Sequence, residues 1–138
     1  MSNIETPIIC ALVADADRAN FLPKFLGFDT LIFELTTYQV LSEYCPEYKG
    51  GYWVMWELSN GGFYMSPGRK DETYSMSCAG NYFDGVMTAD AAGIVACLVA
   101  LSRMLWRKPE EKLNNLFYRL RDWAGEHPEA DKIFAAID

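Results

Sequence analysis

The Asn60-Gly61 dipeptide places the strongest constraint on the fold of this chain, because it separates two runs rich in aromatic and apolar residues, 53–58 and 63–66. Asn-Gly tolerates positive φ at both central positions of a type I′ turn, the tight connection that matches the twist of a β-hairpin. The sequence therefore predicts an antiparallel hairpin with a two-residue loop. The expected cross-strand pairs are Leu58 with Phe63, Glu57 with Tyr64, Trp56 with Met65 and Met55 with Ser66.

Side-chain alternation gives this hairpin two unlike faces. The apolar face is expected to hold Val54, Trp56, Leu58, Phe63 and Met65. The mixed face is expected to hold Trp53, Met55, Glu57, Ser59, Tyr64 and Ser66. A slip of one residue would carry Glu57 and Ser59 into the core, so the pattern favours this register.

Two further strands are predicted on either side of the hairpin. Residues 8–13, IICALV, form a short β-favouring apolar run typical of a buried strand. Residues 73–78, TYSMSC, alternate in polarity as a third, half-exposed strand of an antiparallel meander would. The turn-rich segment 79–85 is interpreted as the connection that follows.

The helical part of the chain is predicted in five segments. Residues 17–27 suit a broken helical turn around Pro23 that ends at Gly27. A helix after Asp29 or Thr30 ends at Cys45-Pro46 and should bury Leu31, Leu35, Tyr38 and Leu41. Thr88 and Asp90 suit the start of a further helix. Its uncharged stretch, 91–101, is about half the length needed to span a bilayer, so we expect a central core helix and not a membrane span. The last two helices should begin near Pro109, burying Leu113, Leu116, Phe117, Leu120 and Trp123, and near Pro128, burying Ile133, Phe134 and Ile137.

The order of these segments predicts an α+β fold, with helices packed on an antiparallel sheet. The 138 residues suit one domain spanning 1–138, with the first seven residues expected to be flexible. The amino-terminal residues lack the basic region and cleavage site of a signal peptide, so we expect a cytoplasmic protein.

Charge and cysteine usage exclude several classes of function. The formal net charge is −7, so the broad positive field of a nucleic-acid-binding protein is missing, and no membrane partner is expected. The 19 Asp and Glu are scattered among 12 Lys and Arg, which disfavours a DNA mimic displaying acidic rows. The four cysteines lie far apart and are interpreted as buried free thiols, so neither a metal site nor a cofactor is expected.

No nucleotide-binding, zinc-protease or esterase motif occurs in the chain. The single histidine, His127, lies in GEHPE between two helices and is interpreted as an exposed connector residue. An alternative remains open, namely a small enzyme acting on nucleic acid, nucleotide or protein. Its carboxylate site would need some of Glu57, Asp71, Glu72 and Asp84 to converge in three dimensions.

The mixed face of the hairpin is the candidate partner surface. Trp53 and Tyr64 beside Glu57 would form an amphipathic aromatic patch if no helix covers them. In the alternative, helices or residues 8–13 cover both aromatics. A protein partner is favoured over a nucleic acid because no Lys or Arg lies between Gly50 and Gly68.

Three segments together resemble the ArdB/KlcA family of antirestriction proteins, which are carried on plasmids and genomic islands. They are FLPKFLG (21–27), EYKGGYWVMWELSNGGFYMSP (47–67) and CAGNYFDGVMTADAAGIVACLVALS (78–102). The resemblance runs from about Asp15 to near Trp106. It implies a small cytoplasmic α+β protein that lets unmodified DNA escape type I restriction without mimicking DNA. The implied partner is the restriction complex or a factor controlling it, and the resemblance carries over no catalytic residue.

Overall fold

The computed structural model describes residues 6–68 and 72–138. The prediction for the first seven residues falls mainly on residues 1–5, outside the described residues. The strands are β1 (Cys10–Leu12), β2 (Trp53–Leu58), β3 (Phe63–Pro67), β4 (Thr73–Cys78) and β5 (Phe83–Thr88). The α-helices are α1 (Arg18–Leu26), α2 (Thr30–Tyr44), α3 (Ala89–Arg107), α4 (Glu111–Glu126) and α5 (Ala130–Ile137). Short 3-10 helices are η1 (Asp15–Asp17), η2 (Gly27–Asp29) and η3 (Ala79–Asn81).

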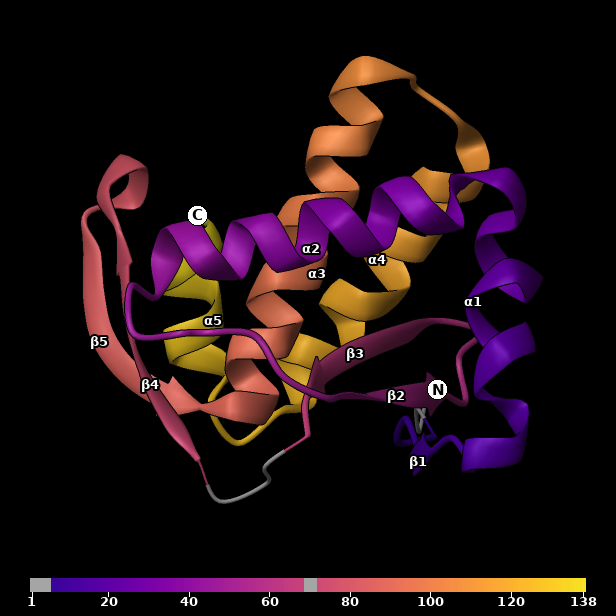
Figure 1. Cartoon of the computed structure of the whole chain (residues 1–138), viewed down its shortest axis with the longest axis horizontal. Helices are drawn as coiled ribbons and strands as arrows, with labels where there is room; N and C mark the ends of the chain where they lie inside the picture. Colours follow the sequence, from indigo (N-terminus) through magenta and orange to yellow (C-terminus); the bar gives the residue numbers. More distant parts are fainter. Residues whose placement is uncertain (1–5, 69–71) are drawn as a thin grey trace, which may run out of the picture.

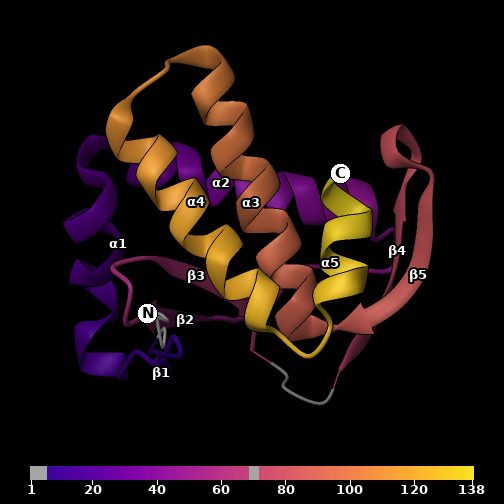
Figure 2. The same ribbon diagram turned by 180° about the vertical axis from the view of Figure 1, so that it is seen from behind.

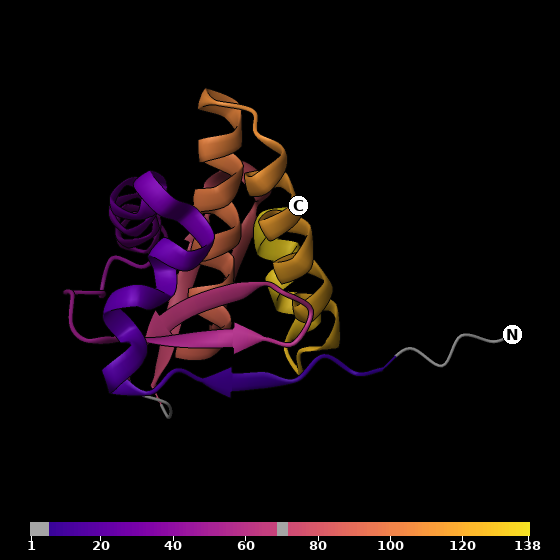
Figure 3. The same cartoon turned by 90° about the vertical axis from the view of Figure 1, so that its right-hand side faces the viewer.

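Helix α3 lies at the centre of the molecule. It packs between α2 on one side and α4 and α5 on the other, as Figures 1 and 3 show. Figure 2 shows α4 and α5 lying over α3 on the rear face. By length and composition alone α3 could cross a membrane, but 67% of its apolar window is buried inside the protein. The predicted cap is confirmed, since Thr88 Oγ1 accepts from the Ala91 N–H at 3.2 Å and Asp90 lies in the first turn.

The strands form two antiparallel sheets, in the orders β1-β2-β3 and β4-β5. The predicted α+β class is thus confirmed, but the predicted meander is wrong in its pairing. Strand β4 pairs with β5, with Thr73 opposite Thr88, and not with β3. Strand β5 occupies part of the segment interpreted as a connection. Figure 1 shows β4 and β5 as a separate hairpin at the far end of α2.

The free edge of β3 is covered by α3 instead of by a strand. The Met65 N–H donates to Cys97 Sγ, and the Cys97 thiol donates to the Met65 carbonyl, both at 3.4 Å. Gly93 brings the helix close enough for these contacts, because a Cβ on it would lie 2.5 Å from the Ser66 Cβ. A helix in this position satisfies edge groups that another strand would otherwise pair.

The register of the β2–β3 hairpin differs by one residue from the prediction. Met55 lies opposite Met65, and Glu57 opposite Phe63. The loop has three residues, since the Leu58 N–H donates to the Gly62 carbonyl at 3.0 Å. Within the loop only Gly61 has positive φ, at 90°, so the turn is not type I′.

This register exchanges the two faces of β2. Trp53 and Met55 are buried in the core, while Val54 and Trp56 are half-buried on the opposite face. The expected penalty for Glu57 does not arise, because its side chain is 49% exposed and forms an ion pair with Lys24 at 2.9 Å. The core assignments of Leu58 at the end of β2 and of Phe63 and Met65 on β3 are confirmed.

Two other expectations about burial are wrong. Strand β1 pairs with β2 as an edge strand, and its Leu12 is 58% exposed instead of buried. Helix α2 spans the predicted range and buries Leu41 as predicted, but most of the face that it turns inward differs from the prediction. Its Leu31 and Leu35 are 66% and 55% exposed, whereas the buried residues are Phe33, Thr37, Val40 and Leu41.

The remaining helices largely follow the predictions. Helix α1 continues through Pro23, so the predicted break there is wrong, and it ends as predicted before Gly27, whose φ is 55°. Helix α4 buries Leu113, Leu116 and Leu120 as expected. The four cysteines are free, with Cys10 half-buried and the other three buried.

Candidate functional site

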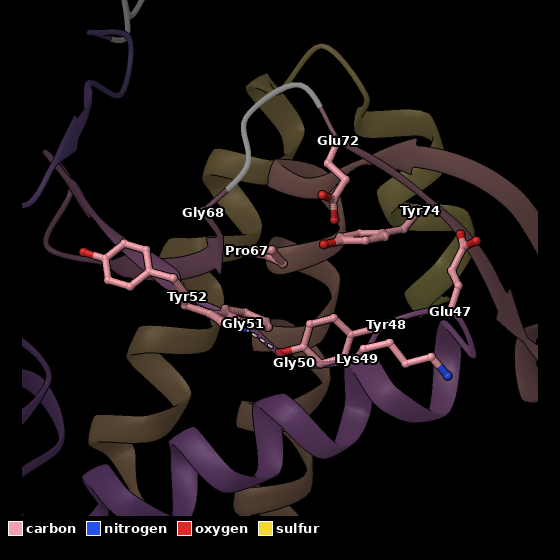
Figure 4. A pocket seen from close by; sticks show the side chains of 11 residues that line it. Glu47, Tyr48, Lys49, Gly50, Gly51, Tyr52, Pro67, Gly68, Glu72 and Tyr74 are labelled. Carbon is pink, nitrogen blue, oxygen red and sulfur yellow. Dashed lines mark hydrogen bonds between the residues drawn. The ribbon is translucent and has the colours of Figure 1, made fainter.

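Two hollows lie on either side of the sheet where β3 ends, and both include Pro67 and Gly68. The first hollow, of about 400 Å³, is shown in Figure 4. It is lined by Glu47, Tyr48, Lys49, Gly50, Gly51, Tyr52, Trp53, Pro67, Gly68, Glu72 and Tyr74. Its floor includes the YKGGYW segment quoted above, so residues on which the family resemblance depends lie together here.

Aromatic contacts hold the first hollow in shape. The Trp53 indole N–H donates to the Tyr48 hydroxyl at 2.7 Å, drawn as a dashed line in Figure 4. The Tyr48 ring packs edge-on against Trp53 and Tyr74, with centroids 6.1 and 6.3 Å away. The chain passes beside them at Gly50 and Gly51, whose φ values of 92° and 138° favour glycine.

The Tyr74 hydroxyl in this hollow stays protonated. Burial raises the pKa of Tyr74 above its usual range, and its hydrogen bond with Glu72 raises this pKa further. Figure 4 shows the Glu72 carboxylate and the Tyr74 hydroxyl turned toward one another. The hollow thus offers ring faces, hydroxyls, carboxylates and the Lys49 side chain, all of which are suited to binding.

The second hollow, of about 710 Å³, lies on the other face of the three-stranded sheet. It is lined by Cys10, Leu12, Val54, Trp56, Tyr64, Ser66, Pro67, Gly68, Thr88, Asp90, Trp123, His127, Pro128 and Glu129. The Trp56 and Tyr64 rings stack with an interplanar angle of 19°, and the Trp56 N–H donates to Ser66 Oγ at 3.0 Å. This wall is therefore a fixed aromatic surface.

A chain of hydrogen bonds closes one side of the second hollow. The Tyr64 hydroxyl donates to Asp90 Oδ1 at 2.8 Å, and His127 Nε2 lies 2.8 Å from Asp90 Oδ2. The Glu129 N–H donates to His127 Nδ1 at 3.0 Å, which leaves His127 Nε2 to pair with Asp90. The Glu129 carboxylate accepts in turn from the Thr88 N–H and hydroxyl.

This arrangement corrects the interpretation of His127 as an exposed connector, since its side chain is only 7% exposed. Both ring nitrogens are engaged in hydrogen bonds. Sequence reasoning identified Asp90 as a favourable residue in the first turn of α3. It missed the partnership of Asp90 with His127, because only the packing of α3 against the α4–α5 connection brings the two together.

The three predicted partner residues do not form one surface. Trp53 is buried in the first hollow and Tyr64 in the second, on opposite faces of the sheet. Glu57 is accessible but lines neither hollow and pairs with Lys24. A role in partner binding for any of the three stays a prediction.

The described carboxylates of the enzyme alternative do not converge. Glu57 lies on β2, Glu72 precedes β4, and Asp84 lies on β5 at the far end of the molecule (Figure 1). Asp71 lies outside the described residues. Within residues 6–68 and 72–138 no group of three or more His, Cys, Asp or Glu side chains could hold a metal ion.

Comparison with known proteins decides the family. The family model of antirestriction proteins matches residues 46–138. The chain belongs to this family. It is 39% identical to the antirestriction protein KlcA of Escherichia coli over 98% of this chain and 97% of that protein. It is 38% identical to the uncharacterized protein YafX of E. coli K12, over 91% and 85% of the two chains.

The fold of this family member matches a solved one. A chain from the structures of the KlcA and ArdB proteins superposes with a TM-score of 0.88, at 38% identity and complete coverage of both chains. Those proteins show antirestriction activity against type I DNA restriction systems in vivo but not in vitro. The resemblance to the ArdB/KlcA family is confirmed.

Proposed function

We propose that this protein acts in the cytoplasm to protect unmodified incoming DNA from type I restriction, by binding a protein of the restriction complex or a factor that controls it. The observation that supports this most directly is the full-length match to the KlcA and ArdB structures. Activity of those proteins in cells but not in vitro favours a mechanism that needs a cellular component beyond the restriction enzyme and DNA.

The geometry of the hollows favours binding over catalysis. The second hollow combines an aromatic wall, which includes the buried indole N–H of Trp123 without a partner in the described part of the chain, with a set of hydrogen bonds around Asp90. Such a site is suited to hold an apolar side chain of a partner without performing chemistry on it. Trp53 and Tyr64 would then contribute indirectly, because their buried side chains shape the walls of the two hollows.

The distribution of charge supports a mechanism other than DNA mimicry. Several carboxylates lie beside cations, so they do not present an uninterrupted row resembling phosphates. These pairs are Lys24 with Glu57, Arg103 with Glu43, Lys112 with Asp29 and Arg121 with Asp138.

This proposal is tested by the plating efficiency of unmodified phage on hosts that carry either a type I or a type II restriction system. Each host is compared with and without the protein. We expect relief of restriction only in the type I host. Unchanged plating in both hosts, with soluble folded protein, would overturn the proposal.

The same assay tests the second hollow with Leu12→Glu, which places a charge at its exposed rim. We expect at least about a tenfold loss of relief, because a charge in an apolar contact disrupts docking. Val86→Glu is the matched control, since Val86 is 49% exposed on β5 and lines neither hollow. Equal relief by both variants would exclude this hollow as the contact site.

A further inference from the structure

Helix α2 has a second apolar face that points away from the core. Phe28, just before the helix, is fully exposed, and Leu31, Ile32 and Leu35 are 66%, 37% and 55% exposed. Trp106, near the end of α3, is 86% exposed. We call these five residues the outer face. Contiguous exposed apolar side chains of this size are characteristic of interaction sites.

The outer face contains a groove between α2 and α3, two helices that cross in Figure 1. This groove of about 550 Å³ is lined by Ile32, Leu35, Thr36, Gln39, Arg103, Met104, Trp106 and Arg107. It shares no lining residue with the two hollows beside β3. The groove is therefore a separate site.

The charges in the groove are all positive, although the chain has a net charge of −7. Arg103 is held by Glu43, with its Nη2 2.8 Å from Glu43 Oε2. Arg107 is exposed and has no ion pair among the described residues. An apolar groove with a free guanidinium at its rim complements an apolar segment that carries carboxylates.

We propose that the outer face binds an amphipathic helix of a partner protein, with an apolar stripe on the groove and carboxylates facing Arg107. The repeat of exposed residues at positions 28, 31, 32 and 35 spans two helical turns, the spacing at which two helices pack along their apolar stripes. Trp106 lines the groove and offers an aromatic contact of the kind that dominates binding energy.

The test uses two synthetic helices of about five turns, each with leucine at i, i+3, i+4 and i+7. In one the flanking positions carry Glu, and in the other Lys. Binding to the full-length protein is followed by the fluorescence of Trp106, identified by its loss in Trp106→Phe, and by calorimetry. We expect the Glu helix to bind at least about fivefold more tightly, with a preference that weakens as salt is raised.

Three variants assign the binding to the groove. Leu35→Ser and Trp106→Ala change exposed residues and should weaken binding of the Glu helix by at least about tenfold. Arg107→Gln should remove most of the preference for Glu over Lys. Tyr82→Ala is the matched control, because Tyr82 is 96% exposed and does not line the groove, and it should bind as the unaltered protein does.

Equal binding of the Glu and Lys helices would overturn the proposal, since the groove would then bind apolar segments without selecting the charge of their flanking residues. Failure of the Glu helix to bind, or an equal loss in Tyr82→Ala, would overturn it as well. The measurement uses purified protein and no restriction assay, so its outcome is independent of the antirestriction proposal.

Discussion

Gly93 is a position at which the fold has no room for a larger side chain. It allows α3 to approach β3 so closely that an added Cβ would lie 2.6 Å from the Met65 carbonyl oxygen and 2.5 Å from the Ser66 Cβ. Both neighbours belong to β3, a strand held in place by hydrogen bonds, so moving either of them would cost free energy. The close approach also brings Cys97 to the backbone of Met65.

Gly93→Ala should therefore lower the free energy of unfolding by about 2 kcal/mol, measured by urea denaturation. Gly125→Ala is the matched control within a helix, because nothing lies within 4 Å of its added Cβ. That control should raise the free energy of unfolding by about 0.5 kcal/mol or more. Equal effects of the two substitutions would contradict the close packing of α3 on β3.

At the scale of elements, the β2–β3 loop decides which side chains face the core. Asn60 does not adopt positive φ. Its Oδ1 accepts from the Gly62 N–H at 3.0 Å, and its Nδ2 donates to the Arg119 carbonyl at 2.9 Å. These bonds to its own loop and to α4 stabilise a three-residue loop over the two-residue turn expected from Asn-Gly.

The loop geometry predicts a difference between two substitutions of Gly61, whose φ is 90°. Gly61→Ala should destabilise the protein by roughly 1–2 kcal/mol, because a Cβ is strained in the left-handed region. Gly61→Asn should cost less, since Asn tolerates this region better. Thermal unfolding of both variants compares them, and a smaller loss for Ala than for Asn would be inconsistent with this loop.

At the scale of the whole molecule, one core serves both sheets, with α3 at its centre. Two buried thiols report on this core, Cys97 on α3 and Cys78 at the end of β4. Burial raises the pKa of Cys97 to about 12 and that of Cys78 to about 11. Both thiols therefore remain protonated in the fold at pH values where an unfolded chain ionises them.

This difference sets the sign of a pH dependence. The unfolded thiol ionises near pH 9.0, so the stabilisation is fully present below that pH and is lost as the pH rises through 9 toward 11 or 12. The contribution of each thiol should fall by about 1.4 kcal/mol per pH unit in this window. Urea denaturation between pH 8 and 10.5 measures the slope, which should be shallower in Cys97→Ala. An unchanged slope would contradict the burial of that thiol.

The sequence by itself determined the positions of most elements, the α+β class and the family. Hydrophobic periodicity, the Thr88 cap and the glycine at position 27 are local signals, and local signals depend only on neighbouring residues. Strand β5 was missed because its Phe83, Asp84 and Gly85 resemble a turn until β4 provides a pairing partner. The same locality explains why the register of the hairpin was predicted one residue away.

The tertiary structure alone decided which faces are buried and what they bring together. Leu31 and Leu35 have the periodicity of core residues, yet α3 packs on the side of α2 that holds Phe33 and Val40. The meeting of Asp90 with His127 spans 37 positions in the sequence. Burial and long-range hydrogen bonds depend on how all helices and strands pack against one another, and this packing exists only in the folded chain.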